Sequence, residues 1–468
     1  MNEIQDNEET DQIKGFCSSI CFIPRSAIDE KPIIVKLTTA EMRDLVINQA
    51  PHVEQPESDD SDADEPKEAM ETEDIPTAII ADVTEDDETA QKYKFANYES
   101  EVAPPPIGAV TKIFSDKPDP YLTGADEEEK DDLADLEVHE NENLVAFVLN
   151  DLDDSELCFS NFNHVNFHSF VRNSTMLDKP PLVIKYLHPD ASEKDGNITL
   201  VAVGYYEPVI ELWDVNIIDG AAPVYSLGKN LSKSQKKNKE LCATTHLEAV
   251  TTLAWSPNMG HVLASGSVDK RVILWDISSE TAATIYSFFG EEIQTLSWHP
   301  FEIGVLLVGT VANNLYLINC GQDMTGESAV KFAIDEECEI EAIDWDRQNP
   351  FLFYVSDATG NLYTFNSTIS GGYQSKVKSH DNPTNVVLAS RTIGGLVVSA
   401  GYGDIIVWKA DVNGVLTKVF NVKSLIGTIF SGDFCPENNN VLGFAGNEGE
   451  KIQFVDISTF EEIAKAFA

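Results

Sequence analysis

The sequence lacks long apolar runs, and none approaches the roughly 18–20 consecutive apolar residues that a membrane-spanning helix needs. Its first 11 residues are polar and acidic, unlike a secretory signal. It also lacks G-x-x-x-x-G-K-[ST], H-E-x-x-H and G-x-S-x-G, the motifs of phosphate-binding loops, zinc proteases and serine hydrolases. We therefore expect no membrane anchor, no catalysis, no cofactor or metal, and no small-molecule substrate.

Cysteine is scarce, with seven in 468 residues, and no two form a C-x-x-C pair. An odd, scattered set is typical of reduced thiols in the cytosol or nucleus rather than of a disulfide framework. Cys17 and Cys21 lie close together, but no second pair or histidine accompanies them, so we do not expect zinc.

Basic residues are few. Lys and Arg number 32 against 79 Asp and Glu, which gives a formal net charge of −47. Such a chain repels phosphate backbones and attracts cationic proteins. The composition therefore favours basic partners such as ribosomal proteins or histones, with at most weak contact to RNA.

The acidic charge is concentrated in the first 142 residues, which hold 39 acidic and 11 basic side chains. Its densest part, Glu54–Glu88, is too poor in apolar residues to offset the entropy of ordering, so we predict a disordered acidic linker over residues 51–92. Residues 93–142 are rich in proline, end in a second acidic run and are predicted to wrap along a surface. Residues 1–50 predict two short strands, Phe16–Pro24 and Pro32–Leu37, and a helix after the Thr38–Glu41 capping box, all docked on a larger domain.

Residues 143–468 are a repeat of short apolar strands. Three segments align, Val250–Pro257, Ile293–Pro300 and Ile340–Asp346, and their tryptophans are 43 and 47 residues apart. In two of the repeats, a strand ends in Trp-Asp, at Trp213-Asp214 and at Trp275-Asp276. A period of about 40–45 residues with four strands and a Trp-Asp ending is typical of WD repeats. We predict an all-β, seven-bladed WD-repeat propeller with blades near 144–180, 182–228, 250–288, 293–334, 340–378, 384–422 and 427–460, of which the first has no Trp.

One repeat carries a full set of polar residues for a hydrogen-bonded blade core: His246, Ser265, Asp269 and Trp275. His380 and Trp408 form an incomplete set in a later repeat, where Tyr402 occupies the turn position. We expect a single blade to be fixed by polar contacts and the others by apolar packing alone. A catalytic or metal-binding role for the histidines is the less favoured alternative.

A propeller avoids an open edge when a strand from one end of the chain completes the blade at the other end. Only ten residues follow Ser458, and residues 460–468 read as a helix. We therefore expect Phe16–Pro24 or Pro32–Leu37 to supply the outer strand of the last blade.

Acidic residues recur in the loops before the innermost strands and predict a negative rim that binds a basic partner. These residues are Glu248, Glu291, Glu292, Glu336, Glu337, Glu339 and Asp381. The alternative is that acids merely belong to the repeat consensus at this position. Ser61 and Thr84, each followed by acids at +1 and +3, are candidate phosphorylation sites.

One dense cationic tract interrupts the acidic chain, and it predicts a targeting element that also touches rRNA phosphates. Its members are Lys229, Lys233, Lys236, Lys237 and Lys239. A solvated loop without function is the alternative, because Ser, Gln and Asn separate the lysines.

The stretch Ile198–Lys233, together with Asp119-Pro120-Tyr121 and Gln294…Glu302, resembles the periodic tryptophan protein 1 family over nearly the whole chain. That resemblance implies a nuclear and nucleolar WD-repeat scaffold, associated with chromatin at the rRNA genes, that acts in rRNA transcription and large-subunit assembly alongside ribosome assembly factors. The alternative is an acidic chaperone or reader for histones or basic ribosomal proteins.

Overall fold

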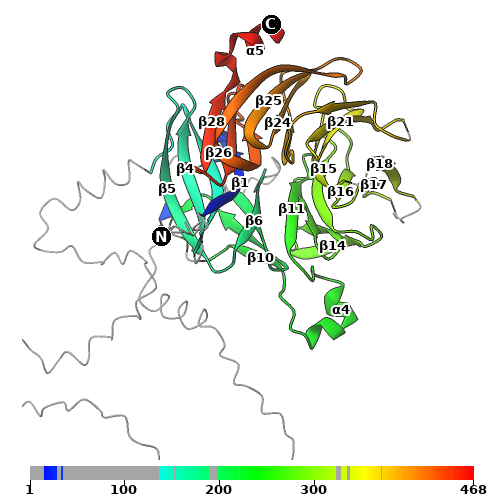
Figure 1. Ribbon diagram of the computed structural model, residues 1–468. Helices are drawn as coiled ribbons and strands as arrows, with labels where there is room; N and C mark the ends of the chain where they lie inside the picture. Colours follow the sequence, from blue (N-terminus) through cyan, green and yellow to red (C-terminus); the bar gives the residue numbers. More distant parts are fainter. Residues whose placement is uncertain are drawn as a thin grey trace, which may run out of the picture. The chain divides into compact units, whose positions relative to one another are not determined.

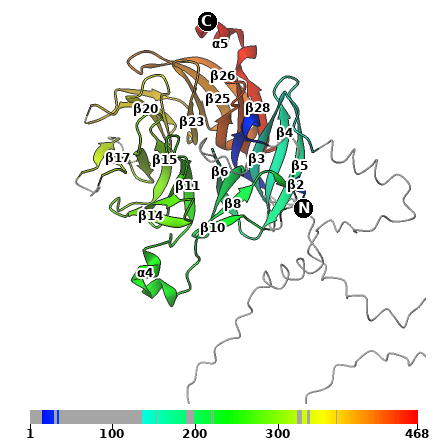
Figure 2. The same cartoon turned by 180° about the vertical axis from the view of Figure 1, so that it is seen from behind.

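The structure, a computed structural model, describes residues 15–28, 33–34, 136–151, 154–188, 198–218, 220, 222–322, 328–334, 338–369 and 371–467. Antiparallel sheets stand around a central channel, and the chain passes from one to the next in sequence order (Figures 1 and 2). The helix expected after Thr38 and the linker over residues 51–92 lie outside the described residues.

Five of the sheets have four strands each, and four of these follow the strand order that the WD-repeat pattern predicts. Among these four, the one that comes earliest in the sequence consists of β6 (Pro181–Leu187), β7 (Leu200–Tyr205), β8 (Val209–Asp214) and β10 (Tyr225–Gly228). The second consists of β11 (Val250–Trp255), β12 (Val262–Ser267), β13 (Val272–Asp276) and β14 (Thr281–Tyr286). The third consists of β15 (Ile293–Trp298), β16 (Val305–Thr310), β17 (Asn314–Asn319) and β18 (Val330–Ala333). The fourth consists of β19 (Ile340–Trp345), β20 (Leu352–Asp357), β21 (Asn361–Asn366) and β22 (Ser375–Lys378).

The N-terminal strand belongs to a fifth four-stranded sheet. That sheet consists, in order, of β1 (Phe16–Ile23), β3 (Glu142–Asn150), β4 (Ser155–Asn163) and β5 (His168–Leu177). The side chains of β1 are almost all buried, because β1 pairs with β3 along one edge and lies beside β6 and β26 around the channel.

The expectation that an N-terminal strand forms the outer strand of the last blade is therefore wrong. The strand β1 is instead the innermost strand of the first sheet, and the ring includes residues 16–23 as well as residues from 143 onward. Of the second expected strand, the structure describes Ile33–Ile34 as β2, which pairs in parallel with β9 (Ile217–Ile218). Alternation of apolar residues predicted strands here, but it carries no information on which edge each would join.

The remaining strands form one six-stranded sheet. It consists of β23 (Val386–Ala389), β24 (Leu396–Ala400), β25 (Tyr402–Ala410), β26 (Leu416–Phe434), β27 (Val441–Gly446) and β28 (Ile452–Asp456). The 19-residue β26 pairs with β25 through residues 416–423 and again at Thr428, and with β27 through residues 429–434. The large sheets thus number six among the described residues, so the expected count of seven blades is not confirmed.

Helices are short. They are α4 (Lys239–Cys242), α5 (Glu461–Ala466) and the 3₁₀ turns η1 (Arg25–Ala27), η3 (Gln235–Lys237) and η4 (Ile457–Thr459). The helix expected at the C-terminal end is present as α5. Within the described part of the chain, no helix is both long and apolar enough to cross a membrane.

Apolar side chains fill the space between successive sheets. The strands β12, β16, β20 and β27 are buried along almost their whole length, as strands with a neighbour on both faces must be. Where the first and last sheets meet, Phe162 of β4 stacks on Phe454 of β28 with ring centroids 3.9 Å apart. The first sheet and the last are therefore joined by the same kind of packed interface as the others.

Candidate functional site

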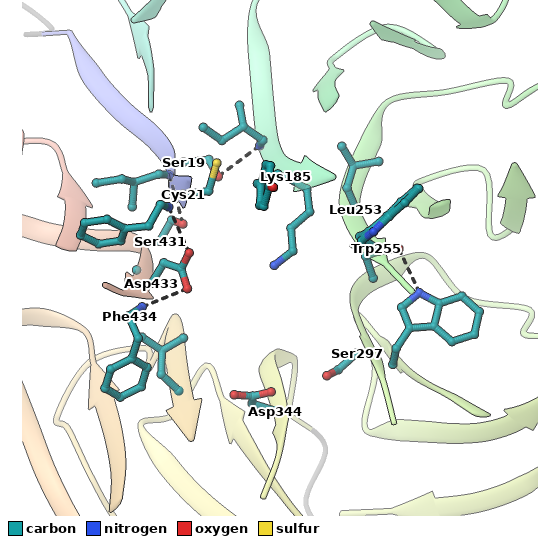
Figure 3. A pocket seen from close by; sticks show the side chains of 18 of the residues that line it. Ser19, Cys21, Lys185, Leu253, Trp255, Ser297, Asp344, Ser431, Asp433 and Phe434 are labelled. Atoms are coloured by element: carbon teal, nitrogen blue, oxygen red, sulfur yellow. Dashed lines mark hydrogen bonds between the residues drawn. The ribbon is translucent and has the colours of Figure 1, made fainter. Parts of the chain in front are cut away.

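The channel is lined by one strand from each repeat: β1, β6, β11, β15, β19, β23 and the second half of β26. Adjacent inner strands are not paired with each other, so side chains have to satisfy their backbone groups along the channel. The lining residues enclose a cavity of about 520 Å³, seen in Figure 3.

Three tryptophans link neighbouring inner strands through the indole N–H. Trp298 donates to the carbonyl of Ala254 at 2.9 Å and Trp345 to that of Ser297 at 3.2 Å. Trp255 donates to the carbonyl of His188, just past β6, at 3.0 Å. Each of these tryptophans thus bonds the repeat that precedes it.

Polar side chains link the other inner strands where tryptophan is absent. Asp344 of β19 accepts the N–H of Ala389 at 2.9 Å. Asp433 of β26 accepts the N–H of Phe22 at 3.1 Å, which ties the last repeat to β1. Asn385 donates to the carbonyl of Ile429 at 2.8 Å, and Ser19 accepts the N–H of Ile184 at 3.2 Å. Every step around the channel therefore carries a side chain-to-backbone hydrogen bond.

The four residues predicted to form a blade core come together. His246 Nδ1 lies 3.1 Å from Asp269 Oδ2, its Nε2 lies 2.7 Å from Ser265 Oγ, and Trp275 Nε1 donates to the same hydroxyl at 2.8 Å. Burial alone would raise the pKa of the Asp269 carboxyl, but hydrogen bonds from His246 and the Leu247 N–H hold that pKa below its usual range. The carboxylate thus orients the histidine, which leaves both ring nitrogens occupied and gives them a structural role.

The expectation that a single blade is fixed by polar contacts is wrong. His380 Nε2 and Trp408 Nε1 both bond Ser399 Oγ, at 3.1 and 2.9 Å, although no Asp completes the set. Burial lowers the pKa of His380 to about 4, so this histidine is neutral at physiological pH.

Two further sheets have polar clusters of different composition. Asp357 of β20 accepts from the Asn361 amide at 2.9 Å and the Tyr363 hydroxyl at 2.8 Å. Glu291, placed before β15, accepts from the Thr310 hydroxyl at 2.7 Å and the Asn314 amide at 2.8 Å.

The residues predicted to form an acidic rim differ in their surroundings. Glu248, Glu339 and Asp381 are exposed in the loops before β11, β19 and β23, and Lys236 lies 3.7 Å from Glu248. Glu291 is half-buried and engaged with Thr310 and Asn314, so it serves the blade. Glu292 is half-buried beside it, and Glu336 and Glu337 lie outside the described residues.

The opposite end of the channel has a different character. Equivalent positions just past the inner strands hold Arg347 after β19, Arg391 after β23 and His188 after β6, and Lys185 of β6 points into the channel in Figure 3. Two carboxylates, Asp344 of β19 and Asp433 of β26, also line the cavity. These channel residues were missed at the sequence level, although an acid directly before the aligned Trp345 and Phe434 was visible in the repeats.

The lysine tract lies between β10 and β11. Lys229, Lys233, Lys236 and Lys237 are exposed, the last two on η3, and Lys236 Nζ donates to the carbonyl of Leu247 at 3.0 Å. Lys239 begins α4. Ser61 and Thr84 lie outside the described residues.

Groups suited to metal binding do not gather in the described residues. No group of three or more His, Cys, Asp or Glu side chains there is placed to hold a metal ion. Cys17 and Cys21 are buried in β1, and burial raises the pKa of both thiols to about 12, which keeps them protonated and unreactive.

Comparison with known proteins agrees with this architecture. Residues 239–276 match the family model "WD domain, G-beta repeat". The chain is similar to periodic tryptophan protein 1 homolog from Drosophila melanogaster, 29% identical over 97% of this chain and 96% of that protein. It is 23% identical to periodic tryptophan protein 1 from Saccharomyces cerevisiae over 75% of this chain and 69% of that one. The resemblance to the periodic tryptophan protein 1 family is confirmed. A solved chain from a structure titled "Crystal Structure of Mitotic Checkpoint Complex" superposes with a TM-score of 0.51 at 16% identity, over 67% of this chain and 84% of that one, which supports the propeller fold.

The structure places the regularly spaced tryptophans at equivalent positions on the inner strands. Trp255, Trp298 and Trp345 are equivalent in the repeat, and each indole bonds a carbonyl of the repeat before it. Propeller and family together point to a non-catalytic WD-repeat scaffold.

Proposed function

We propose that this protein is a non-enzymatic scaffold in ribosome biogenesis, located in the nucleus and nucleolus, that acts in large-subunit assembly and in rRNA gene transcription on chromatin. The observation that carries the proposal is the end-to-end similarity to periodic tryptophan protein 1, over 97% of the chain. The net charge of −47 supports basic proteins, such as ribosomal proteins or histones, and ribosome assembly factors as partners, with RNA contact weak.

We further propose that the ring has seven blades. The strand β26 pairs with β25 up to Lys423 and again at Thr428, and with β27 from Ile429 onward, and residues 424–427 are not part of either ladder. Read in this way, the six-stranded sheet is two blades joined by one continuous strand. The seven inner strands that line the channel support this count.

The basic partner is proposed to bind the rim that precedes the inner strands. Glu248, Glu339 and Asp381 are the exposed acids there, and like charges around one channel mouth favour a cationic peptide. Because Glu291 accepts hydrogen bonds within its own blade, we assign it a structural role beside any role in binding.

The lysine tract is proposed to direct the protein to the nucleolus, and Ser61 and Thr84 are proposed phosphorylation sites that deepen the charge of the acidic linker. Replacement of Lys229, Lys233, Lys236, Lys237 and Lys239 by alanine should disperse a nucleolar signal. Retention of the full signal would contradict the targeting role.

The proposal is tested by affinity purification of the tagged full chain, with identification of the proteins and RNA that it retains. Ribosomal proteins and assembly factors are expected, whereas recovery of none of them would overturn the proposal. A triple variant, Glu248→Lys, Glu339→Lys and Asp381→Lys, should lose the basic partners without unfolding. The control is Glu461→Lys on α5, whose exposed carboxylate lies 2.6 Å from Lys465.

An acidic chaperone or reader for histones or basic ribosomal proteins, working apart from the rRNA genes, is the alternative. The same purification separates the two. Histones or free ribosomal proteins without assembly factors and without pre-rRNA would favour the chaperone.

A further inference from the structure

The channel end beyond the inner strands is positively charged, which is unusual in so acidic a chain. The side chains that line the cavity include four that carry or can carry positive charge, Lys185, His188, Arg347 and Arg391, and two carboxylates, Asp344 and Asp433. With histidine neutral, cations outnumber anions in this lining, although the whole chain has a net charge of −47.

Both carboxylates are committed to the protein itself. Asp344 accepts the N–H groups of Ala389 and Trp345, each at 2.9 Å, and Arg347 lies 3.9 Å away. Asp433 accepts the N–H of Phe22 at 3.1 Å and of Phe434 at 2.9 Å, and Arg391 lies 3.9 Å away. Their oxygens therefore neutralise the channel cations only in part, because backbone donors already share their charge.

Lys185 is the cation that the described residues leave without a hydrogen-bond or ion-pair partner. It is exposed to the channel, and in Figure 3 its side chain extends toward the middle of the cavity, between β1 and β11. Arg347 also has an unused donor, since its Nε is buried without a hydrogen-bond partner. Donors of this kind are satisfied when an anion enters the cavity.

Prolines share the mouth with these cations. Pro24, Pro257 and Pro436 occupy positions equivalent to those of Arg347 and Arg391, each just past its inner strand, and Trp255 stands beside them. Such a rim gives apolar contact to a peptide laid across it, which a free small anion could not exploit. Polyanions such as RNA are disfavoured because the net charge of the chain repels them, whereas one carboxylate carries little of that repulsion.

We propose that this end of the channel is a binding site for a peptide carboxylate, which enters the cavity to pair with Lys185 while the peptide backbone lies across the proline-lined mouth. The carboxylate comes either from a Glu or Asp side chain or from a free C-terminus. The site lies at the opposite end of the inner strands from the acidic rim, so it goes beyond the proposed function and does not depend on it.

The test uses the full chain and short glycine peptides that carry an uncharged fluorescent dye, with binding followed by anisotropy. One peptide has a central Glu and an amidated C-terminus, the second has Gln in place of Glu, and the third has only glycine with a free C-terminus. Saturable binding of the first or the third peptide is expected, and the one that binds identifies the source of the carboxylate. Binding of neither, or equal binding of the Gln peptide, would overturn the proposal.

Variants then locate the site. Lys185→Ala should weaken binding by about tenfold or more, as expected for loss of one partner of a close charge pair, while Lys185→Arg keeps it. Lys418→Ala, which removes an exposed lysine on β26, is the matched control and should bind as the wild type does. Unchanged affinity of Lys185→Ala, or displacement of the peptide by an equal concentration of free glutarate, would overturn the assignment. Because Lys185 is exposed, its replacement should leave the melting temperature unchanged, and Lys185→Arg checks binding independently of folding.

Discussion

Single polar side chains inside the sheets do more than fill space. Asp269 receives three bonds at once, from His246 Nδ1, from the Leu247 N–H at 2.9 Å and from the Arg271 N–H at 3.0 Å. Burial makes each of these donors costly to leave without a partner. The Asp269 side chain therefore holds the turn after β12 and the loop before β11 in one arrangement.

Replacement of Asp269 by alanine should lower the free energy of unfolding by at least about 2 kcal/mol, because it leaves three buried or half-buried donors without an acceptor. Asp404→Ala is the control: its pair with Lys423, at 2.6 Å, involves a largely exposed lysine and should contribute less than about 1 kcal/mol. Urea denaturation followed by tryptophan fluorescence measures both. Equal losses in the two variants would contradict the structural role of the cluster.

His380 should make stability depend on pH. Its pKa is lowered to about 4 by burial, whereas in the unfolded chain it returns to about 6.5. Between these values the unfolded state binds the extra proton, so the free energy of unfolding falls as pH decreases from 6.5 to 4, by up to about 3 kcal/mol from this residue.

Carboxylates titrate in the same range, so the comparison must be made with a variant. His380→Gln should show a shallower loss of stability between pH 6.5 and 4 than the wild type. If the melting temperature falls with decreasing pH equally steeply in His380→Gln and in the wild type across that range, the assignment is contradicted.

At the level of strands, side-chain hydrogen bonds satisfy backbone groups along the unpaired edges of the inner strands. Inner strands approach one another around the channel without pairing, and indole, carboxylate, amide and hydroxyl groups bond the backbone in turn. The joint between β26 and β1 uses Asp433 and also Ser431, whose hydroxyl accepts the Ile20 N–H at 3.3 Å. Closure thus depends on residues far apart in sequence.

The strand β1 should stay in place without its covalent link to β3. A protease site inserted after Glu88 and cleaved in the native protein should leave the N-terminal fragment bound, because Cys17 and Ile23 are fully buried and β1 pairs along β3. Size-exclusion chromatography measures this. Separate elution of the fragment without denaturant would contradict the position of β1, and the same cleavage in urea is the control for release.

The sequence was informative where the repeat sets the register. Trp255, Trp298 and Trp345 fixed the phase of three sheets, and the strands near them fell where the alignment placed them. It was not informative on β1, because any amphipathic strand fits several sheet edges. The roles of Asp344 and Asp433 were also missed, since each carboxylate bonds a strand of another repeat, and spacing within one repeat does not reveal that neighbour.

The polar clusters within the blades were likewise only partly predictable from the sequence. His380 was read as part of an incomplete set because the turn Asp is absent, but Ser399 still bonds both His380 and Trp408. Asp357 and Glu291 collect donors of different types, so no consensus pattern identifies them. Hydrogen-bond satisfaction depends on three-dimensional neighbours rather than on matching letters.

For the molecule as a whole, buried cysteines at the junction of the first and last repeats allow opening of the ring to be measured. Three of the four buried cysteines pack in the cluster at this junction: Cys17 in β1, Cys158 in β4, and Cys435 just after β26, whereas Cys21 of β1 packs toward β6 and β7. Cys435 Sγ accepts a hydrogen bond from the Asn143 amide at 2.8 Å, which links the two sides. Opening of the ring would expose the three junction thiols together.

Thiol labelling should therefore occur in two phases. At pH 8, an aromatic disulfide reagent should react readily only with Cys242 and Cys338, which are half-buried, because burial raises the pKa of the Cys320 thiol to about 11. Cys17, Cys158 and Cys435 should react slowly and at a common rate, since burial protects them until the junction opens. Asp433→Ala, which removes one bond at the junction, should accelerate that slow phase and leave the fast phase unchanged. Rapid labelling of Cys17 in the native protein would contradict this closure.

The place of β1 also sets an order of events during synthesis. Residues 16–23 leave the ribosome before the rest of the ring, yet one of their neighbours, Asp433, follows 411 residues later. Until then the N–H groups of Ile20 and Phe22 lack their acceptors, and this edge of β1 is open to the wrong partner. The nascent ring can close only after Asp433 has been made, so the interval in which it needs protection from misassembly lasts as long as the synthesis of these 411 residues.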